Sequence, residues 1–194
     1  MNDTIKILAF AGSSRAASFN KKLIKVAVKS AQKAGAQVTF IDLKDYPMPL
    51  VDQDLEESSG IPANAQKVKD LMVANDGFLI ASPEYNSSIT PLLKNTIDWA
   101  SRSSVKGEAA MIAFKGKVAA IMSASPGGLG GMRSLVTVRS VLENNGVIVL
   151  PRQQAIPKAH EAFDPSGKLI DQKQQDAIDK LTAELVRVIG KLKV

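Results

Sequence analysis

The chain has 194 residues, a formal net charge of +6 at pH 7, one histidine (His160) and no cysteine. This length suits one α/β domain with a full core, so we expect a single domain over residues 1–194. The missing cysteines exclude disulfides and Cys-ligated centres, and a lone histidine excludes multi-histidine sites, so we predict no metal site.

Short apolar segments alternate with amphipathic segments along the chain. Residues 5–11 are mostly apolar and end at Gly12, which is typical of a parallel strand buried on both faces. A helix is predicted from Ser18, because apolar residues recur at helical spacing up to the stop at Gly35. Further strands are predicted at 37–43, 78–81, 117–123 and 147–150, and further helices at about 63–74, before 102, up to about 144 and at 171–192.

Two stretches show no such pattern and are predicted to be irregular. The first is a long loop after the second strand, which contains Tyr46 and an acidic cluster at residues 52–57. The second covers residues 153–168. No apolar run approaches the ~18 residues of a membrane span, and residues 1–6 lead into the first strand without a cleavage site. We therefore expect a cytoplasmic protein.

Five strands that alternate with helices predict an α/β fold with a parallel, doubly wound sheet. In such sheets, ligands bind beyond the carboxyl ends of the strands, at the point where the strand order reverses. In the flavodoxin-like strand order 2-1-3-4-5, that point lies between strands one and three. The loops that follow strands one, three and four are therefore the candidate ligand-binding segments.

The loop after the first strand carries groups that suit a phosphate monoester. Residues 12–20 offer three hydroxyls, the Arg15 guanidinium, the Asn20 amide and the free N–H groups of a helix start. Neither GxGxxG nor GxxxxGK[ST] is present, which disfavours a dinucleotide Rossmann site and a P-loop kinase. The alternative is that Ser18 only caps the helix and that Arg15 is solvated.

The other two loops suit a flat heteroaromatic ligand. Residues 83–91 contain Tyr85 and Asn86, which can stack on and hydrogen-bond to a ring, although Thr90 and Pro91 also fit an ordinary helix start. Residues 123–131 are rich in glycine, which lets the backbone approach a ring closely. A glycine-rich loop alone is weak support, but three such loops at one sheet edge are considerably stronger.

Nearly the whole chain resembles the NADPH-dependent FMN reductase family, which includes chromate-, azo- and quinone-reducing enzymes. The motifs that carry the resemblance are Gly12-Ser13-Ser14-Arg15 with Ser18-Phe19-Asn20, and Ser82-Pro83-Glu84-Tyr85-Asn86 continuing into Pro91-Leu92-Leu93-Lys94-Asn95 and Asp98-Trp99. The resemblance implies a flavodoxin-like three-layer sandwich with a five-stranded sheet in the order 2-1-3-4-5.

The same resemblance implies which residues bind FMN. The first loop would bind the phosphate group, and the second would lie along the isoalloxazine and the ribityl chain. The third loop matches the family pattern less securely. The implied residues are Ser13, Ser14, Arg15, Ser18, Phe19 and Asn20, then Pro83, Glu84, Tyr85, Asn86 and Ser87, and finally Ser125, Gly127 and Gly128. The family is typically dimeric or tetrameric, and the loop around residues 46–54 and the helix with Trp99 and Arg102 would help to form interfaces.

A flavin accounts for the lack of catalytic side chains, because the cofactor itself carries the redox chemistry. We predict an NAD(P)H-dependent enzyme that reduces small acceptors (quinones, azo compounds, chromate or free flavin) by a ping-pong cycle, with FMN as cofactor and NADPH or NADH as co-substrate. The alternatives are a flavodoxin-type electron carrier and a flavin-less nucleic-acid-binding or regulatory domain.

The distribution of positive charge bears on the nucleic-acid alternative. Many lysines fall on predicted helix faces, and the first helix alone contains Lys21, Lys22, Lys25, Lys29 and Lys33. We interpret this row as a solvated face. Because few aromatic residues are available to stack on bases and no nucleic-acid-binding motif is present, we predict neither a nucleic-acid partner nor a membrane partner.

Overall fold

The structure, a computed structural model, describes residues 4–193; the outer ends of the predicted 1–194 domain, including residues 1–3 of the N-terminal segment discussed above, lie outside the described residues. The strands are β1 (Lys6–Ala11), β2 (Gln37–Phe40), β3 (Gly77–Ala81), β4 (Val118–Ala124), β5 (Ile148–Val149) and β6 (Gln154–Ile156). The helices are α1 (Phe19–Lys33), α2 (Gln53–Ser59), α3 (Ala63–Val73), α4 (Pro91–Ala100), α5 (Met132–Asn144) and α6 (Gln172–Leu192), and residues Leu43–Asp45 form a 3₁₀ turn.

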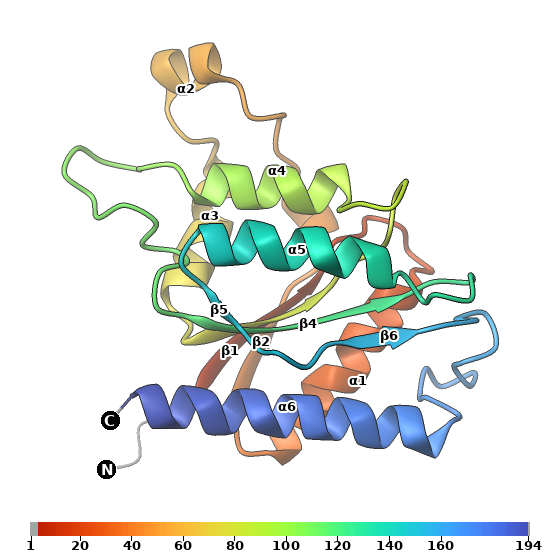
Figure 1. The fold of residues 1–194 in the computed structure, drawn as a ribbon. Helices are drawn as coiled ribbons and strands as arrows, with labels where there is room; N and C mark the ends of the chain where they lie inside the picture. Colours follow the sequence, from red (N-terminus) through yellow and green to blue (C-terminus); the bar gives the residue numbers. More distant parts are fainter. Residues whose placement is uncertain (1–3, 194) are drawn as a thin grey trace.

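The sheet is parallel and has the strand order β2-β1-β3-β4-β5, which confirms the predicted flavodoxin-like order. Helices α1 and α6 cover one face, and α3, α4 and α5 cover the other, so the domain has three layers (Figure 1). None of the helices within residues 4–193 is long and apolar enough to cross a membrane.

The sheet contains one strand more than predicted. Strand β5 pairs only with Val118 and Ala119 of β4, whereas β6 pairs with the later residues of β4, from Met122 to Ala124. Pro151 lies between these two short strands and has no N–H to donate to the ladder, so pairing is interrupted there. Part of the stretch predicted to be irregular therefore extends the sheet.

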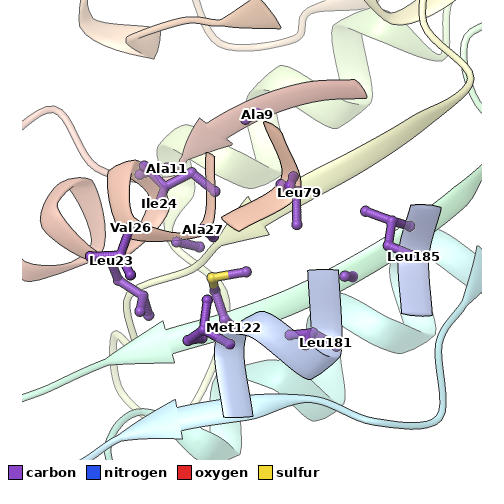
Figure 2. Close-up of a cluster of buried hydrophobic side chains, with 14 of the residues drawn as sticks. Ala9, Ala11, Leu23, Ile24, Val26, Ala27, Leu79, Met122, Leu181 and Leu185 are labelled. Atoms are coloured by element: carbon purple, nitrogen blue, oxygen red, sulfur yellow. The ribbon is translucent and has the colours of Figure 1, made fainter. Parts of the chain in front are cut away.

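The core between the sheet and helices α1 and α6 fixes the edge from which the candidate loops leave. Side chains of β1, β3 and β4 point toward α1 and α6, as Figure 2 shows for Ala9, Leu79 and Met122. They meet Leu23 and Leu181, which are fully buried. Burial of each such leucine contributes about 1.5–3 kcal/mol to folding, so the strand ends are held firmly.

The predicted long loop after β2 contains an unpredicted helix. Helix α2 has no buried residue and projects from the body of the domain (Figure 1). The acidic cluster explains its formation, because the Asp52 carboxylate accepts hydrogen bonds from the backbone N–H groups of Asp54 (2.9 Å) and Leu55 (3.2 Å). The base of this excursion is held by Trp99, whose Nε1–H donates to the Pro49 carbonyl at 2.8 Å.

A buried lysine anchors the segment between α4 and β4. The Lys69 side chain is only 2% exposed and donates to the Arg102 carbonyl (2.6 Å) and the Ser104 hydroxyl. It also pairs with Glu108, and the hydrogen bonds from Lys69 and from the Ser104 backbone N–H hold the pKa of the Glu108 carboxyl below its usual value. Charge-assisted bonds therefore fix the first part of this segment, up to Glu108, whereas Ala113 and Phe114 hold its later part by packing in the core.

Candidate functional site

Three loops leave the sheet side by side. Strand β3 lies between β1 and β4, and Ala81 is paired with Ala11 on one side and with Met122 on the other. The segments that follow these strand ends are residues 12–18, which we name loop 1, residues 82–90, loop 2, and residues 125–131, loop 3. All the predicted FMN-binding residues lie on these loops or on the first turn of α1.

Loop 1 presents groups that can bind an anion. Ser13 is 7% exposed, and its hydroxyl has no hydrogen-bond partner within residues 4–193, although it is not fully shielded. Arg15 is exposed and has no carboxylate partner in the same range; its guanidinium lies 5.6 Å from the centre of the Phe19 ring. Ser18 caps α1 by accepting from the Lys21 N–H at 3.4 Å, as the alternative predicted. The unpaired guanidinium and hydroxyl beside this helix start suit a phosphate group.

Two residues near the start of α1 have structural partners that the sequence did not reveal. Asn20 donates to the Ala124 carbonyl at 2.8 Å and accepts from the Ala124 N–H at 3.0 Å, so its amide connects α1 to the end of β4. Its predicted contact with phosphate stays a prediction, and its observed partner is a backbone group.

Lys21 does not belong to the solvated lysine face in which we placed it. It is 7% exposed, and its ammonium group lies 2.6 Å from an Asp42 carboxylate oxygen and 3.4 Å from the Ser14 carbonyl. At the start of α1 this position points toward the end of β2 instead of toward solvent. The remaining lysines of that face line an open groove of about 820 Å³ between α1 and the start of α6, away from the three loops; they are Lys22, Lys25, Lys29 and Lys33.

Loop 2 contains a tight two-residue turn. Tyr85 and Ser88 exchange two backbone hydrogen bonds of 3.0 Å, and the residues between them have positive φ, 50° at Asn86 and 66° at Ser87. These values are those of a type I′ turn, which asparagine tolerates well. The turn holds Tyr85 at 57% exposure, so its ring is available to a ligand. Thr90 and Pro91 also take the predicted N-cap and N1 positions of α4.

Loop 3 combines a glycine that the protein requires with one that it does not. Gly130 has φ +62°, and a Cβ there would lie 2.7 Å from backbone atoms of Ile156 and Pro157. At Gly128 φ is not positive, and a Cβ would meet no protein atom within 4 Å. Glycine at position 128 thus leaves open space over exposed backbone, which fits the approach of a flat ring.

Hydrogen bonds connect the three loops, one of them directly and the others through residues that adjoin the loops. The Thr90 hydroxyl donates to the Gly12 carbonyl at 2.7 Å, which joins loops 1 and 2. The Asn20 amide joins the start of α1 to the strand end before loop 3. The Glu84 carboxylate accepts from the Arg133 backbone N–H (3.1 Å) and Nε–H (2.7 Å), which joins loop 2 to the start of α5. The loops are therefore fixed relative to one another before any ligand binds.

A helix start with an exposed guanidinium, an exposed aromatic turn and an open glycine loop lie along one sheet edge and would suit a flavin mononucleotide. Residues 5–161 match the model of the NADPH-dependent FMN reductase family. The chain belongs to this family. The match confirms the predicted resemblance and, at the level of the family, an oxidoreductase that depends on FMN and NAD(P)H and reduces small molecules.

Individual oxidoreductases match this chain over almost their full length. The NAD(P)H-dependent FMN reductase of Pseudomonas aeruginosa is 34% identical over 181 residues, which cover 93% of this chain and 92% of that protein. A probable NADPH:quinone oxidoreductase of Oryza sativa is 34% identical, with coverage of 96% and 92%. The solved structure of the NAD(P)H:(acceptor) oxidoreductase FerB from Paracoccus denitrificans superimposes with a TM-score of 0.82 at 29% identity and covers 97% of this chain and 98% of its own.

Proposed function

We propose that this member of the FMN reductase family holds FMN across loops 1, 2 and 3 and transfers two electrons from NAD(P)H to a small acceptor. The observation that carries the proposal is the set of three loops at the carboxyl edge of β1, β3 and β4, which hydrogen bonds connect directly or through the adjoining residues of α1, β4 and α5. When bound, FMN would supply the redox chemistry by accepting hydride from NAD(P)H and passing two electrons on.

The side chains of the three loops divide the tasks of binding FMN. Arg15 and the Ser13 hydroxyl, beside the first N–H groups of α1, would bind the phosphate, with Ser14, Ser18, Phe19 and Asn20 shaping that end of the site. Tyr85 would cover one side of the ring system, and Pro83, Glu84, Asn86 and Ser87 would border the ring and the ribityl chain. Ser125, Gly127 and Gly128 would let the backbone of loop 3 approach the ring.

The acceptor site would be the open side of the flavin, which NAD(P)H and the acceptor occupy in turn. Quinones, azo compounds, chromate and free flavin are the predicted acceptors, and an open site beside exposed loops suits such varied molecules. The net charge of +6 favours anionic co-substrates by electrostatic steering. A cytoplasmic location and a single domain over residues 1–194 belong to the same proposal.

A homodimer or homotetramer would complete the assembly. Large apolar side chains lie exposed on α5 and on the segment before α2, among them Val136 (66%), Met132 (50%) and Leu50 (75%). Exposed apolar side chains of this kind mark protein interfaces when they gather on one surface. Within one chain Trp99 is fully buried and Arg102 pairs with Glu56 of α2 at 2.8 Å. Both residues therefore hold the projecting segment with α2, which would contact a partner subunit.

Steady-state kinetics test the proposed cycle. With NADPH and a soluble quinone varied together, we expect parallel lines in double-reciprocal plots, because the two substrates use the same site in turn. Lines that intersect would mean that both substrates bind together, and the shared-site cycle would be wrong. Lack of NADPH and NADH oxidation in FMN-loaded protein would contradict the enzymatic function itself.

A further inference from the structure

We infer that Glu84 is a positioning residue: with Arg133, it clamps loop 2 to the start of α5 and so holds the two flavin-facing loops at a fixed separation. This inference rests on the proposed function. It assigns the Glu84 carboxylate to a protein partner, whereas the sequence motif suggested only that the residue lies along the flavin. The clamp consists of the Glu84 carboxylate, the Arg133 guanidinium and the Arg133 backbone N–H.

The Glu84 carboxylate uses both of its oxygens in this contact. One carboxylate oxygen of Glu84 lies 2.7 Å from Arg133 Nε and 2.5 Å from Arg133 Nη2, and the other accepts the Arg133 backbone N–H at 3.1 Å. The Glu84 side chain is 9% exposed, while that of Arg133 is 59% exposed. The carboxylate is therefore enclosed and meets three N–H donors of one residue, two of them charged, and charge-assisted hydrogen bonds of this kind are stronger than neutral ones.

The contact also caps helix α5 from another part of the chain. Gly131 occupies the N-cap position with φ 86° and has no side chain that could accept a helix N–H. Glu84 accepts the N–H of the second residue of α5, which is the bond that an N-cap side chain ordinarily makes. A carboxylate is also favoured at this end by the helix dipole. Loop 2 thus supplies the cap that loop 3 lacks.

The position of the clamp connects it to the flavin. Glu84 directly precedes Tyr85 and the I′ turn, and Arg133 is the second residue after loop 3. Close by, the Ser123 hydroxyl donates to the Gly130 carbonyl at 2.8 Å, so loop 3 is held on its inner side while the clamp holds its far end. A site held by such supporting bonds loses less ordering entropy when its ligand binds. The clamp should therefore act on FMN affinity more than on global stability, since its arginine is exposed.

The test compares Glu84→Gln, Arg133→Ala and the double variant in FMN titrations of flavin-free protein. Each single change should weaken FMN binding by roughly tenfold, through lost preorganisation. The double variant should bind FMN as tightly as the single variant with the lower affinity, because both changes break the same clamp. Glu143→Gln is the matched control, since it removes a carboxylate that pairs with Arg139 on the same helix at 3.4 Å, away from loop 2. The control should bind FMN like wild type.

Hydrogen exchange in flavin-free protein gives a readout that does not depend on FMN. In Glu84→Ala, the Arg133 amide should exchange about tenfold faster, because its acceptor is gone, while amides of β3 and β4 keep their protection. Unchanged exchange at Arg133, unchanged FMN affinity, or single effects that multiply in the double variant would each overturn the clamp. Failure of wild-type protein to bind FMN would instead contradict the proposed function, so the two failures are distinguishable.

Discussion

Replacing Arg15 with alanine is expected to weaken FMN binding by roughly 10- to 150-fold, which corresponds to about 1.5–3 kcal/mol for hydrogen bonds to a charged group. The physical reason is that the Arg15 guanidinium is exposed and has no carboxylate partner within residues 4–193, so its donors are available to a phosphate. Its position over the Phe19 ring keeps it beside the start of α1. Fluorescence titration of flavin-free protein with FMN measures the change.

The matched control for Arg15→Ala is Arg187→Ala. Arg187 is exposed on α6 and has no ion pair within the described residues, so its removal changes the net charge by the same amount without touching the three loops. The control should keep wild-type affinity, apart from a small change that salt suppresses. Equal losses in both variants would show that only overall charge matters, and unchanged affinity in Arg15→Ala would remove Arg15 from the phosphate site.

Gly130→Ala is expected to destabilise the protein by about 2 kcal/mol or more and to abolish high-affinity FMN binding. A non-glycine residue at φ +62° is strained, and its Cβ would lie 2.7 Å from backbone atoms between Ile156 and Pro157, which cannot move as a side chain can. Loop 3 would be forced away from β6. Urea denaturation of flavin-free protein gives the stability change, and FMN titration gives the loss of affinity.

Gly128→Ala is expected to lower FMN affinity without lowering the stability of the fold. Because a Cβ at Gly128 meets no protein atom within 4 Å, this variant should keep its stability within about 0.5 kcal/mol of wild type. It should nevertheless bind FMN less tightly, because the methyl group occupies space left for the ring. Normal FMN affinity in Gly128→Ala would place the ring elsewhere, and normal stability of Gly130→Ala would contradict the close packing of loop 3 on β6.

Much of the fold could be predicted because alternating apolar and amphipathic segments determine it. The buried runs of β1, β3 and β4 are continuous and apolar, which is the pattern of parallel strands covered on both faces. Strand β6 escaped prediction because three residues, Gln154–Ile156, are too few to show a period. Helix α2 escaped because it buries no residue and therefore has no apolar stripe, although Asp52 was a cap signal.

The sequence predicted each loop of the candidate site separately, but it could not predict the hydrogen bonds that connect the loops. The bonds from Thr90 to Gly12, from Asn20 to Ala124 and from Arg133 to Glu84 join residues 78, 104 and 49 positions apart. No local pattern reports such pairs. Lys21 was misplaced for the same reason, because its partner Asp42 lies beyond β2. The residue types indicated the chemistry of the site, and only the three-dimensional contacts showed how its loops are held in place.

The most direct test of the account is the visible spectrum of protein that has been incubated with FMN, desalted and then mixed with NADPH without oxygen. We predict that the protein retains flavin absorbance near that of free FMN in intensity and that NADPH bleaches it. Protein that leaves the desalting step colourless would contradict FMN binding by the three loops. Retained colour that neither NADPH nor NADH bleaches would contradict the reductase function and favour the electron carrier instead.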